Sequence, residues 1–424
     1  MNDHSPIPPQ LSRRTVLRAG MLAAAAALLA ACDRALSPSP PPGTLVPSAS
    51  PLATFPGVTP APTLPPSPLP TGSPASGELT LREKIARMIV VGFRGLTLDT
   101  SPWVVSAIRD KQLGGVILFD RDGPTGGVRN IDSPSQVRRL VADLRALAPD
   151  RELIVAIDQE GGLVTRLSPK YGFPAVASEA TIGAKGKAAV TTWANGLAAT
   201  LGDMGITLNF APVVDVNVNP RNPAIGALDR SFSADPDIVA RDAAIEVTAH
   251  RGQGVRTALK HFPGLGSATV NTDFGVSDVT RTWTDMELDP YRNLIDAGLV
   301  DLVMAAHVVN GQIDPNAPAS LSPATITGLL RGQLGFDGPV VTDDMQAVAI
   351  TDAFGDDEAV QLAIEAGCDL LLFANQSGYK PARFGQVVDL VEGLVNDGTI
   401  TEARIDASIA RLEKVFPSNG GSAG

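Results

Sequence analysis

The sequence contains little cysteine, histidine and basic charge, and each shortage excludes a class of protein. Its 424 residues include 2 cysteines and 4 histidines, too few for a disulfide scaffold or a cysteine-rich metal cluster. The net charge is −11 and no basic stripe is visible, so we expect no nucleic-acid partner. The apolar fraction of 44% suffices for a full core, and this length predicts two or three ordinary domains or one large α/β barrel.

The first 31 residues have the pattern of an export signal. Arg13 and Arg14 precede an apolar run over residues 19–31, which is too short to cross a bilayer but long enough for the core of a signal peptide. The arginine pair resembles a twin-arginine signal, and the residues before Cys32 resemble a lipoprotein processing site that would leave Cys32 lipidated. The alternative is an uncleaved anchor helix. Both interpretations predict an extracytoplasmic protein tethered to the cell membrane.

Residues 32–77 are expected to form a disordered stalk that begins at the lipidated cysteine. Residues 33–77 contain 14 prolines, and such a segment buries too little apolar surface to offset the entropy of ordering. Removing residues 1–31 would leave a net charge of −13. So acidic a chain is not attracted to anionic lipid, and we expect membrane attachment through the N-terminal lipid only. A flexible tail is predicted over residues 417–424.

Between residues 78 and 416, short apolar runs alternate with amphipathic segments of helical period. Eight such runs with intervening helices are typical of a single (β/α)8 TIM-like barrel. The competing architecture, an open doubly wound sheet, would carry a glycine-rich phosphate turn after an early strand, and none is present. The expected strands are 86–92, 115–119, 153–157, 207–213, 257–260, 302–306, 339–342 and 370–373, and the expected helices include 135–148, 188–203, 236–253, 285–297, 323–334 and 357–366.

Polar residues follow the ends of five of the expected strands. They are Asp158, Asp215, Lys260-His261, His307 and Asp343-Asp344. In a barrel these positions converge on the C-terminal mouth, where active sites are built. Any single Asp after a strand is better explained by a helix cap or a turn, and a cap is our interpretation of Asp344. The other six acidic and basic residues, gathered on one rim, favour an active site.

The residue types at this mouth restrict the chemistry. No ligand spacing typical of a metal site is present, and neither a phosphate loop nor a Gly-x-Ser-x-Gly turn occurs, so we expect no metal and no cofactor. Carboxylates beside lysine, histidine and arginine are suited to bind sugar hydroxyls and to act on an acetal. The sequence therefore predicts carbohydrate processing. A retaining glycosidase would need a nucleophilic carboxylate and an acid/base group about 5 Å apart.

Four motifs occur along this part of the chain. They are Asp158-Gln159-Glu160-Gly161-Gly162 with Val164 and Arg166, Asp229-Arg230-Ser231-Phe232, Lys260-His261-Phe262-Pro263-Gly264-Leu265-Gly266, and Val341-Thr342-Asp343-Asp344-Met345. In kind and in order they resemble the motifs of glycoside hydrolase family 3, in its β-N-acetylhexosaminidase branch. The resemblance extends from about residue 79 to residue 416 and implies one catalytic barrel over residues 78–416.

The resemblance implies a role for each matching residue. Asp343 would attack the anomeric carbon as the nucleophile, and neighbouring Lys260 and Arg230 would depress its pKa. By the resemblance, Asp158, Arg166, Arg230, Lys260 and His261 would bind the sugar. His307 is expected to bind it as well, because it follows the sixth expected strand on the same rim. For His261 the alternative is a buried histidine satisfied by a backbone carbonyl.

Three positions depart from the family pattern. The family branch places its acid/base in an Asp-Ser-His triplet on a loop after the fifth strand, whereas this chain has Asn271-Thr272-Asp273. Leu265 replaces the second histidine of its motif and Leu163 replaces an arginine. These changes affect the expected mechanism more than the expected fold.

Three interpretations of the missing histidine follow. In the first, Asp273 is the acid/base, because repulsion from ionised Asp343 and partial desolvation keep its proton in place. In the second, Asp278 or Glu287 takes that role. In the third, the barrel binds sugar but hydrolyses it poorly, which would make the protein a tethered glycan-binding protein.

The predicted function is a retaining β-N-acetylhexosaminidase that acts on N-acetylglucosamine-containing cell-wall glycans, with a β-glucosidase of the same family as the alternative enzyme. A carboxylate acid/base would repel a phosphate acceptor, which favours hydrolysis over phosphorolysis. Two residues outside the rim also carry expectations. Cys368 is interpreted as a small core residue, and His250 as a surface residue near a helix end.

Overall fold

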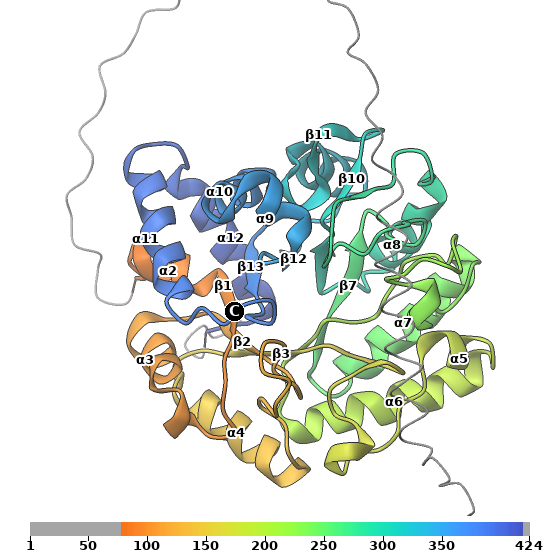
Figure 1. The fold of residues 1–424 in the computed structure, drawn as a ribbon, viewed down its shortest axis with the longest axis horizontal. Helices are drawn as coiled ribbons and strands as arrows, with labels where there is room; N and C mark the ends of the chain where they lie inside the picture. Colours follow the sequence, from red (N-terminus) through yellow and green to blue (C-terminus); the bar gives the residue numbers. More distant parts are fainter. Residues whose placement is uncertain (1–77, 419–424) are drawn as a thin grey trace, which may run out of the picture. The chain divides into compact units, whose positions relative to one another are not determined.

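The computed structural model describes residues 78–418, which fold around a closed barrel of parallel strands (Figure 1). The hydrogen-bonded order of the strands is β1-β13-β12-β9-β7-β6-β3-β2. Val90 of the first strand pairs with Leu372 of the last strand on one side and with Gly115 on the other, which closes the barrel. The predicted (β/α)8 barrel is confirmed.

The barrel strands lie near their expected positions. They are β1 (Ile89–Gly92), β2 (Gly115–Leu118), β3 (Ile154–Ile157), β6 (Leu208–Asn209), β7 (Arg256–Phe262), β9 (Leu302–Ala305), β12 (Val340–Asp344) and β13 (Leu370–Phe373). Two strands are longer at their C-terminal ends than the apolar runs indicated, so Lys260, His261, Asp343 and Asp344 lie within strands β7 and β12. Their side chains are therefore fixed by the barrel backbone.

Two of the strand predictions were too long. The run expected from residue 86 begins inside helix α2 (Leu81–Arg87), which starts at a capping box between Thr80 and Glu83. The run expected over 207–213 is reduced to β6, although Val213 still forms a single parallel β-bridge with Lys260.

Helices cover the outside of the barrel (Figure 1). Several begin at side-chain caps followed by proline in the first turn, as at Ser133 and Asp235. The helices are α2, α3 (Pro102–Lys111), α4 (Pro134–Ala146), α5 (Glu179–Gly183), α6 (Lys187–Met204), α7 (Pro236–Arg251), α8 (Asp289–Asp296), the π-helix η6 (Ala324–Gln333), α9 (Val348–Phe354), α10 (Asp356–Ala366), α11 (Arg383–Asn396) and α12 (Glu402–Val415).

Short additional elements follow the C-terminal ends of the barrel strands. After β3, strands β4 (Gln159–Gly161) and β5 (Val164–Thr165) form an antiparallel hairpin. After β7 and β9, strands β8 (Ser277–Asp278), β10 (Val308–Asn310) and β11 (Asp314–Pro318) form a small sheet. The short 3₁₀-helices are η1 (Leu98–Thr100), η2 (Pro169–Tyr171), η3 (Gly226–Leu228), η4 (Asp285–Leu288) and η5 (Ala319–Leu321).

Two residues away from the barrel mouth carried expectations. Cys368 is buried in the core as expected, and burial raises the pKa of its thiol to about 12. The surface position expected for His250 was wrong, because its side chain is fully buried on α7. Burial lowers the pKa of His250 to about 4. The neutral ring donates from Nδ1 to the carbonyl of Glu246 (2.8 Å) and accepts at Nε2 from Asn209 (3.1 Å).

Several predictions concern the two ends of the chain. The expected signal peptide (1–31), the lipidated Cys32, the stalk (32–77) and residues 419–424 of the tail lie outside the described residues. The first two residues of the expected tail are packed, since the amide of Glu152 donates to the carbonyl of Pro417 and Ser418 forms a β-bridge with Arg151. Between residues 78 and 418, no helix combines the length and apolarity needed to cross a membrane.

Candidate active site

A cavity of about 380 Å³ opens at the C-terminal ends of the barrel strands. Its wall combines strand-end residues with residues of the loops after β2, β3, β6, β7 and β13. Eight of the acidic and basic residues singled out from the sequence line it together: Asp158, Arg166, Arg230, Lys260, His261, Asp273, Asp343 and Asp344. The cavity is thus the place where the structure brings the four motifs into contact.

A buried cluster of charges forms one side of the cavity. Lys260 donates from Nζ to Asp158 Oδ1 (2.9 Å) and to Glu160 Oε1 (2.7 Å). Arg230 forms two hydrogen bonds to the same Glu160 carboxylate, at 2.7 and 2.8 Å. Burial opposes ionisation of Glu160, but Arg230 and Lys260 outweigh it and hold the pKa of Glu160 well below its usual value. Lys260 keeps its proton as well, because Asp158 and Glu160 offset the effect of burial and raise its pKa.

Glu160 is a member of the site to which the sequence analysis assigned no role. It follows Gln159 in the first motif, and its place in that motif was the sequence signal that could have identified it. Its main partner, Arg230, is 70 positions away in the chain, so only the fold reveals the pair. Arg230 uses its guanidinium on Glu160, on the carbonyl of Ala224 (2.8 Å) and near His261 Nε2 (3.3 Å). We therefore interpret Arg230 mainly as the residue that fixes Glu160 and His261.

The β4–β5 hairpin places Arg166 over the cavity. The side chain of Gln159 accepts from the amides of Arg166 and Leu167, both at 2.9 Å. The turn needs Gly161, which has a φ of +103° and lies so close to Ala177 that a Cβ would be 2.2 Å from the carbonyl oxygen. Arg166 is half-buried, 3.6 Å from Asp158, and retains donors that face the cavity.

His261 is held by a carboxylate and not by a backbone carbonyl. Its Nδ1 lies 2.6 Å from Oδ2 of Asp215, which is completely buried. Oδ1 of Asp215 also accepts from the amide of Leu265 at 2.7 Å. Asp215, identified in the sequence only as a polar strand-end residue, therefore fixes the ring, leaving Nε2 of His261 toward the cavity beside Arg230.

Asp343 is the next-to-last residue of strand β12 and lines the cavity. Burial works to raise its pKa, but His307 and His261 beside it, together with the amide of Asp344 that donates at 2.8 Å, lower the pKa below its usual value. Asp343 therefore remains a carboxylate. An ionised, oriented oxygen of this kind is what a nucleophilic role requires.

Asp273 lies across the cavity mouth on the loop after β7. Its side chain remains accessible at the rim, but partial burial in the cavity and the negative charge of Asp343 raise its pKa. The loop turns here through Asn271, whose side chain accepts from the amide of Asp273 (2.9 Å). The carbonyl of Thr272 accepts from the amide of Ala349 (3.3 Å), which ties the loop to α9.

The two other candidate acids do not line the cavity. Asp278 is exposed on β8, and hydrogen bonding to Thr280 lowers its pKa. Glu287 is buried in η4 beneath the loop after β7, where a Cβ on Gly264 would be 2.8 Å from the Cβ of Glu287. Burial raises the pKa of Glu287 to about 7. Of these three candidate acids, Asp273 alone lines the cavity, and its pKa is raised.

Asp344 is the last residue of the nucleophile strand and lines the cavity, and His307 contacts its backbone from outside the cavity lining. His307 was expected to bind substrate, but it is buried outside the cavity lining and both ring nitrogens are engaged. Nδ1 is 2.7 Å from the hydroxyl of Ser320, and Nε2 is 3.0 Å from the carbonyl of Asp344. Asp344 Oδ1 accepts from the amides of Gln346 and Ala374, and burial raises its pKa to about 7. Asp344 thus caps the turn after β12, and His307 supports that turn.

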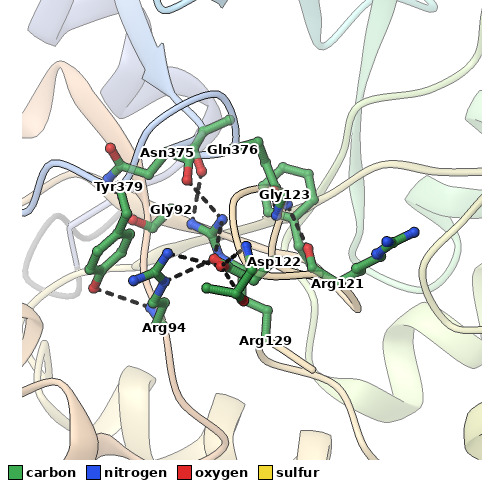
Figure 2. Close-up of polar contacts among 12 residues, drawn as sticks. Gly92, Arg94, Arg121, Asp122, Gly123, Arg129, Asn375, Gln376 and Tyr379 are labelled. Atoms are coloured by element: carbon green, nitrogen blue, oxygen red, sulfur yellow. Dashed lines mark hydrogen bonds and ion pairs between the residues drawn. The ribbon is translucent and has the colours of Figure 1, made fainter. Parts of the chain in front are cut away.

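The wall formed by the loop after β13 is held by a network that the sequence analysis missed (Figure 2). Arg129, fully buried, donates to the carbonyls of Asn375 and Ala374, both at 2.9 Å. Gln376, which lines the cavity, bonds the amide of Gly123 (2.6 Å) and the carbonyl of Arg121 (2.9 Å). The loops after β1, β2 and β13 are therefore locked together.

Comparison with known proteins agrees with this geometry. The profile of the glycosyl hydrolase family 3 N-terminal domain matches residues 80–415. The chain belongs to glycosyl hydrolase family 3. Among its relatives, the β-hexosaminidase of Xanthomonas oryzae pv. oryzae is 37% identical over 297 residues, which cover 67% of this chain and 83% of that protein.

Solved family 3 structures have the same barrel. A β-N-acetylglucosaminidase from Paenibacillus sp. str. FPU-7 superposes with a TM-score of 0.73 at 36% identity, covering 80% of this chain and 62% of the other. A β-N-acetylhexosaminidase from Beutenbergia cavernae DSM 12333 superposes with a TM-score of 0.71 at 33% identity, covering 80% of this chain and 98% of the other. This chain thus spans nearly the whole length of one solved relative and under two thirds of the other.

The departures from the family 3 motifs fall at different depths. Leu163 is 75% exposed at the tip of the β4–β5 hairpin, whereas Leu265 is buried against the cavity. Asp273 occupies the rim itself. Within residues 78–418, no group of three or more His, Cys, Asp or Glu side chains is arranged to hold a metal ion.

Proposed function

We propose that this family 3 protein is a retaining β-N-acetylhexosaminidase. The observation that carries the proposal is that two carboxyl groups of one cavity, Asp343 and Asp273, have pKa values shifted in opposite directions. Such a separation assigns the two roles of a retaining glycosidase, a carboxylate nucleophile and a protonated acid. The named β-hexosaminidase relatives support the choice of sugar.

In the first step, an Asp343 oxygen attacks the anomeric carbon and the bond from that carbon to the leaving oxygen breaks. The carboxyl proton of Asp273 passes to the leaving oxygen, so the aglycone departs as a neutral alcohol. A glycosyl ester on Asp343 and an ionised Asp273 remain. The negative charge on Asp273 then draws a proton from water in the second step.

In that second step, water attacks the anomeric carbon from the side that the aglycone left. Its proton goes to Asp273 and its oxygen stays on the sugar, while the bond to Asp343 breaks. The sugar is released with its original anomeric configuration, and both carboxyl groups return to their starting states. No group outside the described cavity is required for either transfer.

The sugar ring would lie against the charged cluster. Asp158 and Lys260 present a carboxylate and an ammonium group in fixed positions, and Arg166 and His261 Nε2 supply donors or acceptors around them. Charged groups of this kind form directional hydrogen bonds with hydroxyls. Binding is expected to be strongest for a sugar whose hydroxyls and C2 substituent meet all four residues.

We further propose that the substrates are N-acetylglucosamine-containing cell-wall glycans and that the protein reaches them as a lipoprotein. This rests on the export signal, Cys32 and the proline-rich stalk of the sequence. Expressing the full chain and its Cys32→Ala variant in a host that processes lipoproteins tests the anchor. The parent should remain with the membrane fraction and incorporate labelled fatty acid, whereas the variant should do neither.

The activity is tested by incubating the protein with an aryl β-N-acetylglucosaminide and the matching aryl β-glucoside. The 2-acetamido substrate should have the higher kcat/KM, and mass spectrometry should detect a glycosyl ester on Asp343. A higher kcat/KM for the glucoside would favour the β-glucosidase alternative. If neither substrate is cleaved but calorimetry shows binding of chitin fragments, the protein is a sugar binder.

A further inference from the structure

The cavity rim carries an exposed aromatic residue whose position the hydrolytic mechanism does not explain. Phe274, the residue after Asp273, is 80% exposed and lines the cavity. Phenylalanine is normally buried because its ring contributes a large apolar surface. The other exposed apolar residues of this loop, Val270 (39%) and Val276 (52%), are not among the residues that line the cavity. Phe274 is therefore distinguished from them by its place at the site.

The loop that carries Phe274 is tied at both ends. The amide of Phe274 donates to the carbonyl of Asn271 (3.1 Å), and Thr272 is bonded to α9 as described above. Directly after Val276, the chain enters β8, which pairs with β10 through Ser277 opposite Val308. The backbone of Phe274 is thus held at the mouth beside the acid, between these two attachments.

The mechanism locates the aglycone relative to this ring. A general acid must come within about 2.6–3.2 Å of the oxygen that it protonates, so the leaving group emerges past Asp273. Phe274 is the next residue in the chain, and its Cα is about 3.8 Å from that of Asp273. Phe274 therefore lies beside the path of the leaving group. The nonreducing sugar, in contrast, lies deeper, against the cluster of Lys260, Asp158 and Glu160.

We propose that Phe274 is a specificity-determining residue that forms the platform for the leaving group, which we identify as a ring with an apolar C–H face, such as a second pyranose. This inference rests on the proposed function. The electron-rich face of the phenyl ring attracts the polarised C–H groups of a sugar ring, and stacking removes exposed apolar surface from water. A small acyclic leaving group makes no such contact.

The test compares two substrates that need the acid equally but differ in the leaving group. N,N′-diacetylchitobiose loses a pyranose and methyl β-N-acetylglucosaminide loses methanol, and both leave as poorly acidic alcohols. In the full chain, Phe274→Ala should lower kcat/KM for the disaccharide about tenfold, equivalent to about 1.4 kcal/mol of transition-state stabilisation. The value for the methyl glycoside should change less than twofold, and Phe274→Trp should retain the disaccharide activity.

The matched control is Val276→Ala, which removes an exposed apolar side chain from the same loop without touching the cavity lining. It should alter neither substrate. An equal loss on both substrates in Phe274→Ala would mean that Asp273 has moved, and no loss on either would mean that the ring is idle; each result overturns the platform. If the unaltered protein cleaves neither glycoside, the proposed function itself fails, which is a different result.

Discussion

The two sides of the cavity are built in different ways. The charged cluster joins Lys260 of β7 and Glu160 of β4 to Arg230 on the loop after β6; Lys260 and Glu160 are almost fully buried, and the charges are paired. The opposite rim, which carries Asp273 and Phe274, is a loop with an accessible surface and few hydrogen bonds. Groups whose charge stays fixed during the reaction are thus paired with opposite charges away from water. The group that must gain and lose a proton is placed where water and the leaving group have access.

The largest effect is expected at the strand that bears the nucleophile. Asp343→Asn removes the attacking charge while preserving the shape of the side chain, so kcat should fall by about 10⁴- to 10⁶-fold, the range seen when one member of a nucleophilic catalytic unit is removed. The check is the steady-state rate on the aryl β-N-acetylglucosaminide, with circular dichroism as the control for folding. Activity close to that of the parent would remove Asp343 from the mechanism.

The corresponding change on the loop should have a smaller and substrate-dependent effect. Asp273→Asn should lower kcat/KM by about 10²- to 10⁴-fold for glycosides with poor leaving groups, and less for an activated aryl glycoside that needs little proton donation. Azide should accelerate the variant on the activated substrate, because a small anion attacks without base assistance and no longer meets a carboxylate.

The pH profile follows from the directions of the two pKa shifts. Asp343, whose pKa is lowered, becomes inactive only when acid protonates it, so it sets the acidic limb. Asp273, whose pKa is raised, becomes inactive when base removes its proton, so it sets the alkaline limb. The profile of kcat/KM should be bell-shaped, and Asp273→Asn should abolish the alkaline limb alone. An unchanged alkaline limb in that variant would assign it to another group.

The cluster of Glu160, Lys260 and Arg230 should contribute measurably to the stability of the folded protein. Glu160→Gln leaves Lys260 and Arg230 buried with less opposite charge, and the free energy of unfolding should fall by about 3–5 kcal/mol. Because the folded-state pKa of Glu160 is depressed, its contribution is present above the ordinary carboxyl pKa and is lost as the pH falls toward the folded value. Urea unfolding at pH 7 and at pH 4 measures both effects. The exposed pair of Asp285 with Arg292 supplies the control, since Asp285→Asn should change nothing measurable.

The smallest effect is expected behind the nucleophile. His307→Ala removes the hydrogen bond to the Asp344 carbonyl and so loosens the backbone that positions Asp343. We expect kcat to fall about tenfold, which is less than the roughly 100-fold that a 1 Å misplacement of a catalytic group can cost. KM should stay constant, because His307 does not line the cavity. His307→Gln, which can still donate at the same place, should recover most of kcat. An increase in KM with constant kcat would instead support the substrate contact expected from the sequence.

Strand and helix predictions succeeded where burial is uniform and failed where a local interaction intervenes. The apolar runs located all eight barrel strands because a parallel strand is covered on both faces. The start of the run at residue 86 was misassigned to a strand, because the helix that begins at the capping box of Thr80 extends through Arg87. His250 was misplaced because a helix end was equated with exposure, whereas its partner Asn209 lies on β6.

The sequence by itself determined the barrel, the family and the residues that would meet at the mouth, because strand periodicity and motif order are local properties of the chain. Only the tertiary structure decided how those residues interact. The pairing of Glu160 with Arg230, the carboxylate partner of His261, the exclusion of Glu287 and Asp278 from the cavity, and the supporting position of His307 all join segments distant in sequence. Their charges and proton affinities depend on burial and on neighbours at hydrogen-bond distance, and those are properties of the folded chain.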